Sequence, residues 1–164
     1  MELFLPCFYG FLGAIGFGMI FNVRGLKLLM GCVGGFLSWL VYLLLAGCFE
    51  TDIPQYFFGT VAMAVFSEVM ARIFKSPVTV FLCPGLIPLV PGSTIYYTME
   101  HFVNGEMDQC MEYGTYTIEI AAALALGILV TSSVVRLWSS GQRKFKLLRS
   151  RRAAAKGANS PQQQ

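Results

Sequence analysis

The sequence predicts an all-α integral membrane protein with five transmembrane helices, the fourth of them broken by proline and glycine. Hydrophobic residues make up 55% of the 164 residues and charged residues only 13%, whereas soluble domains carry about 25% charged residues. Uncharged runs long enough to cross a bilayer, about 17–25 residues, recur along the chain. All 12 Lys and Arg residues fall between these runs, at their ends or after them, where one threading places them on a single side of the membrane.

The expected spans cover residues 3–22, 28–49, 54–74, 77–99 and 114–136. The first two contain glycines three or four residues apart, a spacing that lets membrane helices approach each other closely. Together the spans form a transmembrane domain over residues 1–138. The remaining residues, 139–164, form a tail that is basic at first. The end of this tail has too little apolar surface to offset the entropy lost on folding, so we expect it to be disordered.

Charge sets the expected orientation, because cytoplasmic loops collect Lys and Arg. With the N-terminus outside, the two inner loops hold Arg24 with Lys27 and Arg72 with Lys75, and the inner tail holds the other basic residues. A four-span alternative without the proline-rich run would turn the basic tail outward. We therefore expect an outer N-terminus and a cytoplasmic tail that attracts anionic membrane lipid and is too short for a nucleic-acid interface.

The stretch PGLIPLVPGS, residues 84–93, predicts the break in the fourth span. Its three prolines each lack an amide hydrogen for the helix, and its two glycines loosen the backbone. Broken backbone at membrane depth is tolerated where protein buries it or water reaches it, and secondary transporters use such half helices to bind substrate. Ser93 and Thr94 stand where an N-cap would begin an outer half helix. A plain proline kink packed by neighbouring helices is the alternative interpretation.

Two acids fall within expected spans. Glu68 lies about 22 Å along the third span, where a carboxylate is costly unless it faces protein or water. Arg72 follows at i+4 on the same face. Two interpretations stay open for this pair: a structural salt bridge, or a relay that couples transport to a proton or ion. Glu119 lies near the outer end of the fifth span and is expected to snorkel to the surface.

Several chemical classes find no support in the sequence. The five cysteines have no metal-site spacing and the lone histidine, His101, is expected to be a solvated loop residue. No nucleophile and base pattern or phosphate-binding loop is present. We therefore expect no enzyme, no metal and no cofactor.

The segment SEVMARIFKSPVTVFLCPGLIPLVPGSTIYYTM, with GFGMIFNV at the end of the first span, resembles the threonine/serine exporter (ThrE) family. It is most similar to the short stand-alone subunit of the YjjB type, which matches the exporter's C-terminal membrane half, and the resemblance covers about residues 3–138. The family's motifs correspond here to Pro88, Leu89, Val90, Pro91, Gly92 and Ser93, then Tyr96 and Met99, and to the pair Phe21 and Asn22. One departure is Arg24, where the family often has proline.

The resemblance implies a subunit of a secondary transporter in a bacterial inner membrane. The exported solute would be a small carboxylate, either threonine or serine or a C4 dicarboxylate such as succinate. It also implies a partner, a second membrane subunit resembling the exporter's N-terminal half. A non-transporting assembly or stability subunit is the alternative.

The candidate site residues follow from the break and from the resemblance together. The expected substrate-binding residues are Pro88, Pro91, Gly92, Ser93, Thr94 and Tyr96. Glu68 and Arg72 are the expected coupling or relay residues, and Phe21, Asn22, Pro84 and Gly85 form the expected structural motif.

Overall fold

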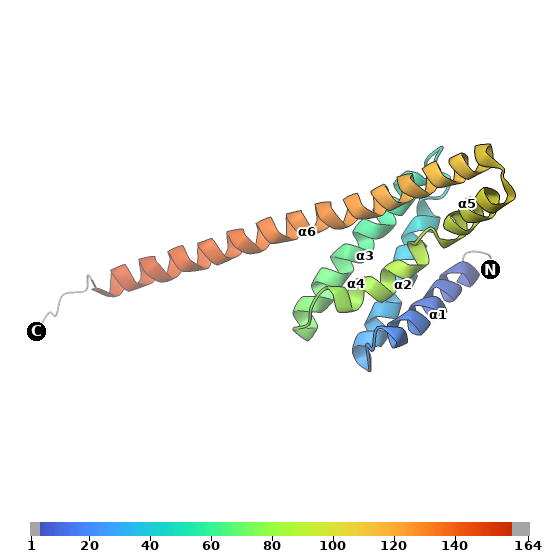
Figure 1. The fold of residues 1–164 in the computed structure, drawn as a ribbon. Helices are drawn as coiled ribbons and strands as arrows, with labels where there is room; N and C mark the ends of the chain where they lie inside the picture. The colour runs from blue at the N-terminus through green and yellow to red at the C-terminus, as the bar shows by residue number, and fades with distance from the viewer. Residues whose placement is uncertain (1–3, 159–164) are drawn as a thin grey trace, which may run out of the picture. The chain divides into compact units, whose positions relative to one another are not determined.

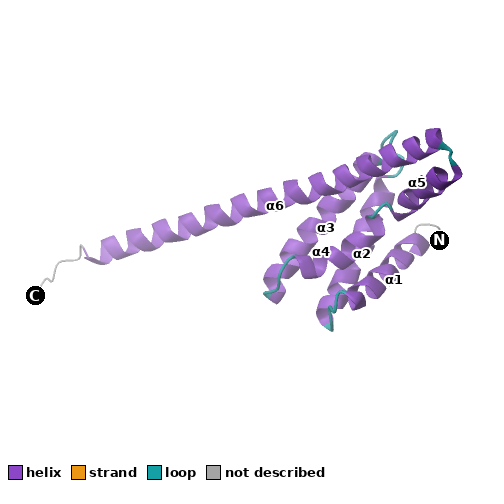
Figure 2. Ribbon diagram, in the orientation of Figure 1, coloured by secondary structure: helices purple, strands orange, loops and turns teal. Residues whose placement is uncertain are grey.

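The computed structural model describes residues 4–158, with side chains described from Leu5 to Trp138. Within this part of the chain every regular element is helical (Figure 2). The elements in order are α1 (Phe4–Ile20), α2 (Leu26–Leu45), α3 (Ile53–Phe74), α4 (Thr79–Leu86), the 3-10 turn η1 (Ile87–Leu89), α5 (Gly92–Asn104) and α6 (Met107–Ala158) (Figure 1). The predicted all-α class is confirmed.

The chain divides into two units, residues 1–131 and 132–164. The first unit contains α1 to α5 and the beginning of α6, and the second contains the rest of α6. The basic segment after Trp138 is helical, since α6 continues to Ala158. The end of the tail, which the sequence predicts to be disordered, lies at residues 159–164, outside the described residues.

Three helical segments are long and apolar enough to cross a membrane: α2, α3 and residues Met107–Trp138 of α6. The helix α1 is apolar but has only 17 residues. The segments Thr79–Leu89 and Gly92–Asn104 form a fourth candidate span only if they are counted as one span. The two segments are bent by 53° relative to each other. The chain is thus a multi-pass membrane protein whose proline-rich segment is bent.

Residues in the left-handed region end several helices. Asn22 has φ 56° just after α1, and the amide of Val23 donates to Gly18 O at 3.0 Å. Asparagine adopts this conformation more readily than most other residues, and here Asn22 turns the chain out of α1. The helix α2 ends earlier than predicted, at Leu45, because Gly47 (φ 94°) lies within the expected span.

Small residues bring α1, α2 and α4 close together. A Cβ added to Gly31 of α2 would lie 2.9 Å from Pro84 Cγ of α4. A Cβ added to Gly35 would lie 3.2 Å from Ala14 Cβ of α1 and 3.5 Å from Gly85 Cα of α4. The glycines of α2 therefore form the surface on which the neighbouring helices pack, as their spacing predicts.

The first part of α6 packs against α3 and the broken segment. A Cβ on Gly127 would lie 3.0 Å from Thr60 Cγ2 of α3. Ile120 and Leu124 of α6 form a buried cluster with Leu89 of η1. Leu89, which directly precedes the break, is thus held in the core by α6.

Candidate functional site

The break lies at Val90 and Pro91, at the end of η1. Val90 is extended (ψ 130°) and Pro91 has ψ 59°, so neither residue is helical. The amide of Val90 donates to Ile87 O at 3.1 Å and the amide of Gly92 to Val90 O at 2.7 Å. These amides therefore donate to carbonyls three and two residues earlier in the chain, whereas an α-helical amide donates to the carbonyl four residues earlier.

Pro84 and Gly85 lie inside α4 and do not interrupt it. The break is accordingly shorter than the ten residues of the proline-rich stretch. A proline keeps a helix-compatible φ of about −65° and removes only one hydrogen bond, here to the first turn of α4. Both residues are buried against α2.

The N-cap of α5 is Pro91, not Ser93 or Thr94. Thr94 lies in the first turn, and its hydroxyl donates back to Pro91 O at 3.1 Å instead of accepting from an amide. The hydroxyl of Thr117 on α6 lies 2.8 Å from that of Thr94. The helix α5 therefore begins at Gly92, earlier than an N-cap at Ser93 or Thr94 would place it. The extended segment ends at Pro91.

The predicted substrate-binding residues lie together at the start of α5, but most of them are open. Gly92, Ser93 and Tyr96 are exposed, and Tyr96 shows 64% of its surface. No residue of α5 is buried. By contrast Pro91 is buried, and Pro88 and Thr94 are half-buried. Because Gly92, Ser93 and Tyr96 are exposed, the predicted substrate-binding residues form an open surface and not an enclosed pocket. The first turn of α5 also presents backbone amides that have no acceptor within the helix.

The predicted coupling pair is not joined. Glu68 is half-buried on α3 and Arg72 is exposed one turn further on. Among the residues whose side chains are described, the ion pair found joins His101 Nδ1 and Glu106 Oε2 at 2.5 Å, and none joins Glu68 to Arg72. The predicted salt bridge between Glu68 and Arg72 is therefore not formed in this structure. In the described part of the chain, neither side chain makes a hydrogen bond to the start of α5.

His101 is half-buried instead of fully solvated. Its ring stacks on Tyr113 of α6, with centroids 5.3 Å apart and planes at 12°, and Tyr97 also contacts Tyr113 at 5.5 Å. Together with the contact to Glu106, this stacking fixes the turn between α5 and α6. The role of His101 visible here is structural.

A second polar group joins α3 and α6 near the N-terminal end of α3. The hydroxyl of Tyr116 donates to Asp52 Oδ2 at 3.2 Å, and Gln55 Nε2 donates to Asp52 Oδ1 at 3.3 Å. Tyr116 also packs against the cluster around Leu89. Asp52 thus fixes the position of α6 beside the broken segment.

Three buried residues of α2 and α3 were not singled out by the sequence. The Ser38 hydroxyl of α2 lies 2.8 Å from Gly35 O and 3.2 Å from Gly85 O, so its hydrogen can be donated to either carbonyl. Met63 of α3 is fully buried. Ser67, also fully buried, has no hydrogen-bond partner for its hydroxyl among the described residues. Their only sequence signal is polar or flexible side chains within apolar helices.

The Met63 side chain lies between two glycines from different helices. A Cβ added to Gly34 of α2 would lie 2.7 Å from both Met63 Sδ and Met63 Cε. A Cβ added to Gly85 of α4 would lie 2.0 Å from Met63 Cε and 2.6 Å from Sδ. Only residues without a side chain leave room for the thioether at these two positions.

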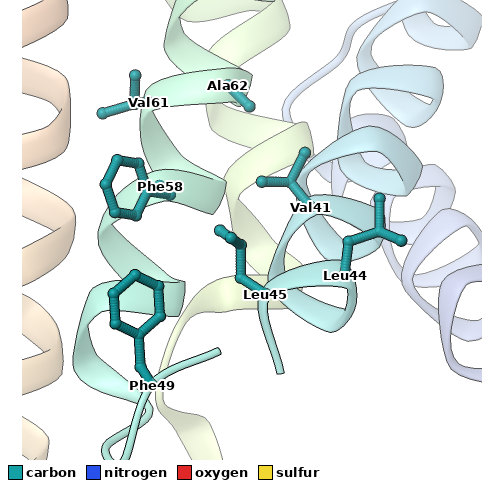
Figure 3. Close-up of a pocket in the computed structure, with 7 residues that line it drawn as sticks. All are labelled: Val41, Leu44, Leu45, Phe49, Phe58, Val61 and Ala62. Carbon is teal, nitrogen blue, oxygen red and sulfur yellow. The ribbon is translucent and has the colours of Figure 1, made fainter. Parts of the chain in front are cut away.

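The hollows on the outside of the bundle have a different character. Figure 3 shows one between α2 and α3, lined by Val41, Leu44, Leu45, Phe49, Phe58, Val61 and Ala62. No polar side chain lines it. Apolar side chains of this kind are suited to lipid tails or another apolar helix and not to a carboxylate. In the described residues no group of three or more His, Cys, Asp or Glu side chains could hold a metal ion.

Comparison with protein families decides the identity of the fold. A family model described as Threonine/Serine exporter, ThrE, matches residues 6–134. The chain belongs to this family. The match includes α1 to α5 and α6 as far as Val134, so the ThrE assignment covers both the broken span and the glycine-packed interior. Searches among curated proteins and among solved structures gave no match. Membership places the chain with exporter-type transporters and not with enzymes.

Proposed function

We propose that this ThrE-family chain is a subunit of a secondary transporter that exports small carboxylates together with a partner membrane subunit. The observation that carries the proposal is the break at Val90 and Pro91, which directly follows Leu89 of the buried cluster. The α5 amides at Ser93 and Thr94 lack helical acceptors, and the positive end of a helix dipole favours an anionic group. A carboxylate of threonine, serine or succinate would bind there.

The open character of α5 supports a partner. Gly92, Ser93 and Tyr96 are exposed, yet a carboxylate at membrane depth has to be shielded from hydrocarbon by protein or water. We propose that a second membrane subunit supplies the other wall of this site. It would resemble the exporter's N-terminal half.

The proposed topology has five spans in a bacterial inner membrane, with an outer N-terminus and a cytoplasmic tail. It treats α1 as a short span and α4, η1 and α5 as one broken span. The segregation of all 12 basic residues supports this arrangement. Glu68 is the proposed coupling group, because it is a half-buried carboxylate in α3 with no ion-pair partner among the described residues.

The test is export of threonine, serine and succinate from cells that lack this chain and its partner. Restoring both should restore export of the true substrate. Ser93→Ala, which removes a hydroxyl proposed to donate to the bound carboxylate beside these amides, should then lower that export several-fold with unchanged abundance of both subunits. Thr98→Val is the matched control on α5, since the Thr98 hydroxyl donates to Thr94 O at 2.7 Å within the helix and faces no proposed substrate.

The assembly alternative makes a different prediction. If this chain only stabilises its partner, raising the partner's expression alone should restore export. Ser93→Ala would then have no effect at normal abundance. Either result would overturn the proposal that the broken helix contacts substrate.

A further inference from the structure

The place where α2, α3 and α4 meet has the features of a closed solute path. We propose that the transported solute passes between these three helices and that the Met63 side chain closes the path in this structure. The Ser38 and Ser67 hydroxyls and the Gly85 carbonyl would line it. This inference rests on the proposed transport function and adds the route, its gate and its preference for charge.

One face of α3 points into this junction. Its buried residues include Gly59, Met63, Ser67 and Ala71, which are four residues apart and therefore share a face. A Cβ on Gly59 would lie 3.1 Å from Ser38 O of α2, and Met63 lies between α2 and α4. Ser67 consequently points to the same junction, about 6 Å further along α3.

The Ser67 hydroxyl is the independent sign of a ligand. It is fully buried and has no hydrogen-bond partner among the described residues. Serine in a membrane helix commonly donates to the carbonyl four residues earlier, and a buried hydroxyl without a partner is unfavourable. A polar group that reaches Ser67 in another state of the cycle would account for its place.

Polar groups therefore lie on either side of the Met63 thioether. Ser38 and Gly85 O lie together at 3.2 Å, next to the glycine that the thioether touches. Ser67 lies one turn beyond. When Met63 withdraws, these groups would form a continuous polar lining between the break and the Phe74 end of α3.

Methionine is suited to the task of a gate. Its side chain is unbranched and rotates about three bonds. The two positions that it touches, Gly34 and Gly85, have no side chains to trap it. The proposed gate therefore uses a side chain that changes rotamer more readily than a β-branched residue would.

The lining also indicates which solute can pass. The buried polar residues of the described part of the chain are Ser38, Gln55, Thr60, Ser67 and Thr131, and none of them is charged. A solute with two carboxylates would cross this junction without a countercharge, at a high desolvation cost. A small zwitterion with zero net charge would lose less, because the carbonyl can accept from an ammonium group and the hydroxyls can donate to a carboxylate.

The experiment measures water access to Ser67 in membranes containing the full chain and its partner. The five native cysteines are replaced by alanine, Ser67→Cys is introduced, and N-ethylmaleimide labelling is timed. A thiol reacts as the thiolate and therefore needs water. The matched control is Ala64→Cys. Ala64 is also buried on α3 but does not belong to the row of residues, four apart, that contains Met63 and Ser67.

With Met63 present, we expect slow labelling of Ser67→Cys. Met63→Ala should speed it about tenfold, which corresponds to a change of about 1.4 kcal/mol in the opening equilibrium. Labelling of Ala64→Cys should stay slow in both backgrounds. If Met63→Ala prevents accumulation of the chain, Met63→Leu replaces it, since leucine keeps most of the volume but lacks the terminal methyl group that reaches Gly85.

Two results would overturn the inference. Equal labelling of Ser67→Cys with and without the Met63 substitution would show that Met63 closes nothing. Faster labelling of both cysteines would show general loosening and no defined path.

The charge preference is tested by adding threonine or succinate in excess during labelling. Protection by threonine alone is expected, whereas protection by succinate would refute the charge preference. The transport proposal fails separately, if export does not depend on the chain although Ser67→Cys becomes accessible.

Discussion

The contact between Gly85 and Met63 gives the sharpest prediction for stability. In Gly85→Ala the new Cβ would lie 2.0 Å from Met63 Cε, 2.6 Å from Met63 Sδ and 3.0 Å from Gly31 O. The first two atoms belong to a flexible side chain, which must leave its place. The third belongs to the backbone of α2 and can move only if the helices separate.

The magnitude follows from two opposing effects. Overpacking of this kind costs about 1–3 kcal/mol, while alanine is favoured over glycine in a helix by about 1 kcal/mol. The difference is about 0–2 kcal/mol, and we expect Gly85→Ala to lower the free energy of unfolding by about 2 kcal/mol, because the contact with Gly31 O cannot be relieved by a side-chain movement. For a chain of this size, 1 kcal/mol corresponds to about 2–4 °C in Tm.

The decisive comparison is the double variant. Met63→Ala alone should cost about 2–5 kcal/mol, because it leaves a cavity in the core. In Met63→Ala with Gly85→Ala the new methyl group occupies part of that cavity. The double variant should therefore be more stable than the sum of the single effects predicts, by about 1–3 kcal/mol.

The assay is thermal unfolding of the purified chain in detergent, followed by the fraction that stays monodisperse. Gly16→Ala in α1 is the control, since nothing lies within 4 Å of its added Cβ. It should leave Tm unchanged or raise it slightly. Additive effects of the Met63 and Gly85 substitutions would refute the argument, because they would show that the thioether does not lie against Gly85.

Three further predictions follow from single contacts. Asn22→Gly should leave stability unchanged, whereas Asn22→Val should lower it by about 1–2 kcal/mol in the same thermal assay, because only the former tolerates φ 56° without strain. Gly92→Ala should not change Tm, since nothing lies within 4 Å of its Cβ. It should nevertheless lower export if a carboxylate approaches the α5 amides, and normal export would contradict that site. Thr117→Val removes the hydrogen bond to Thr94 and should cost about 1 kcal/mol, whereas Thr115→Val, on an exposed position of α6, should cost less.

The candidate site shows where prediction from sequence reaches its limit. Proline and glycine chemistry is local, so the stretch from Pro84 to Ser93 was sufficient to predict a break. The exact place of the break was not, because Pro84 fits within α4 once Gly31 of α2 leaves room for its ring. The interpretation of Glu68 and Arg72 also depended on side-chain conformation, which an i+4 spacing permits but does not impose.

The sequence by itself determined that this is a helical membrane protein and that its proline-rich segment is interrupted. Each of these follows from hydropathy, charge or backbone chemistry within one segment. Hydropathy reports what suits lipid and not where a helix stops, so the extent of α6 beyond the expected span could not be inferred from it. The basic segment up to Ala158 is helical although it is polar.

Only the tertiary structure decided which residues meet. Gly34, Met63 and Gly85 lie far apart along the chain, yet one thioether fills the space that both glycines leave. Ser38 reaches the Gly85 carbonyl across a helix interface, and Ser67 is buried without a partner in the described part of the chain. Such contacts depend on how three helices cross, and no pattern within a single helix carries that information.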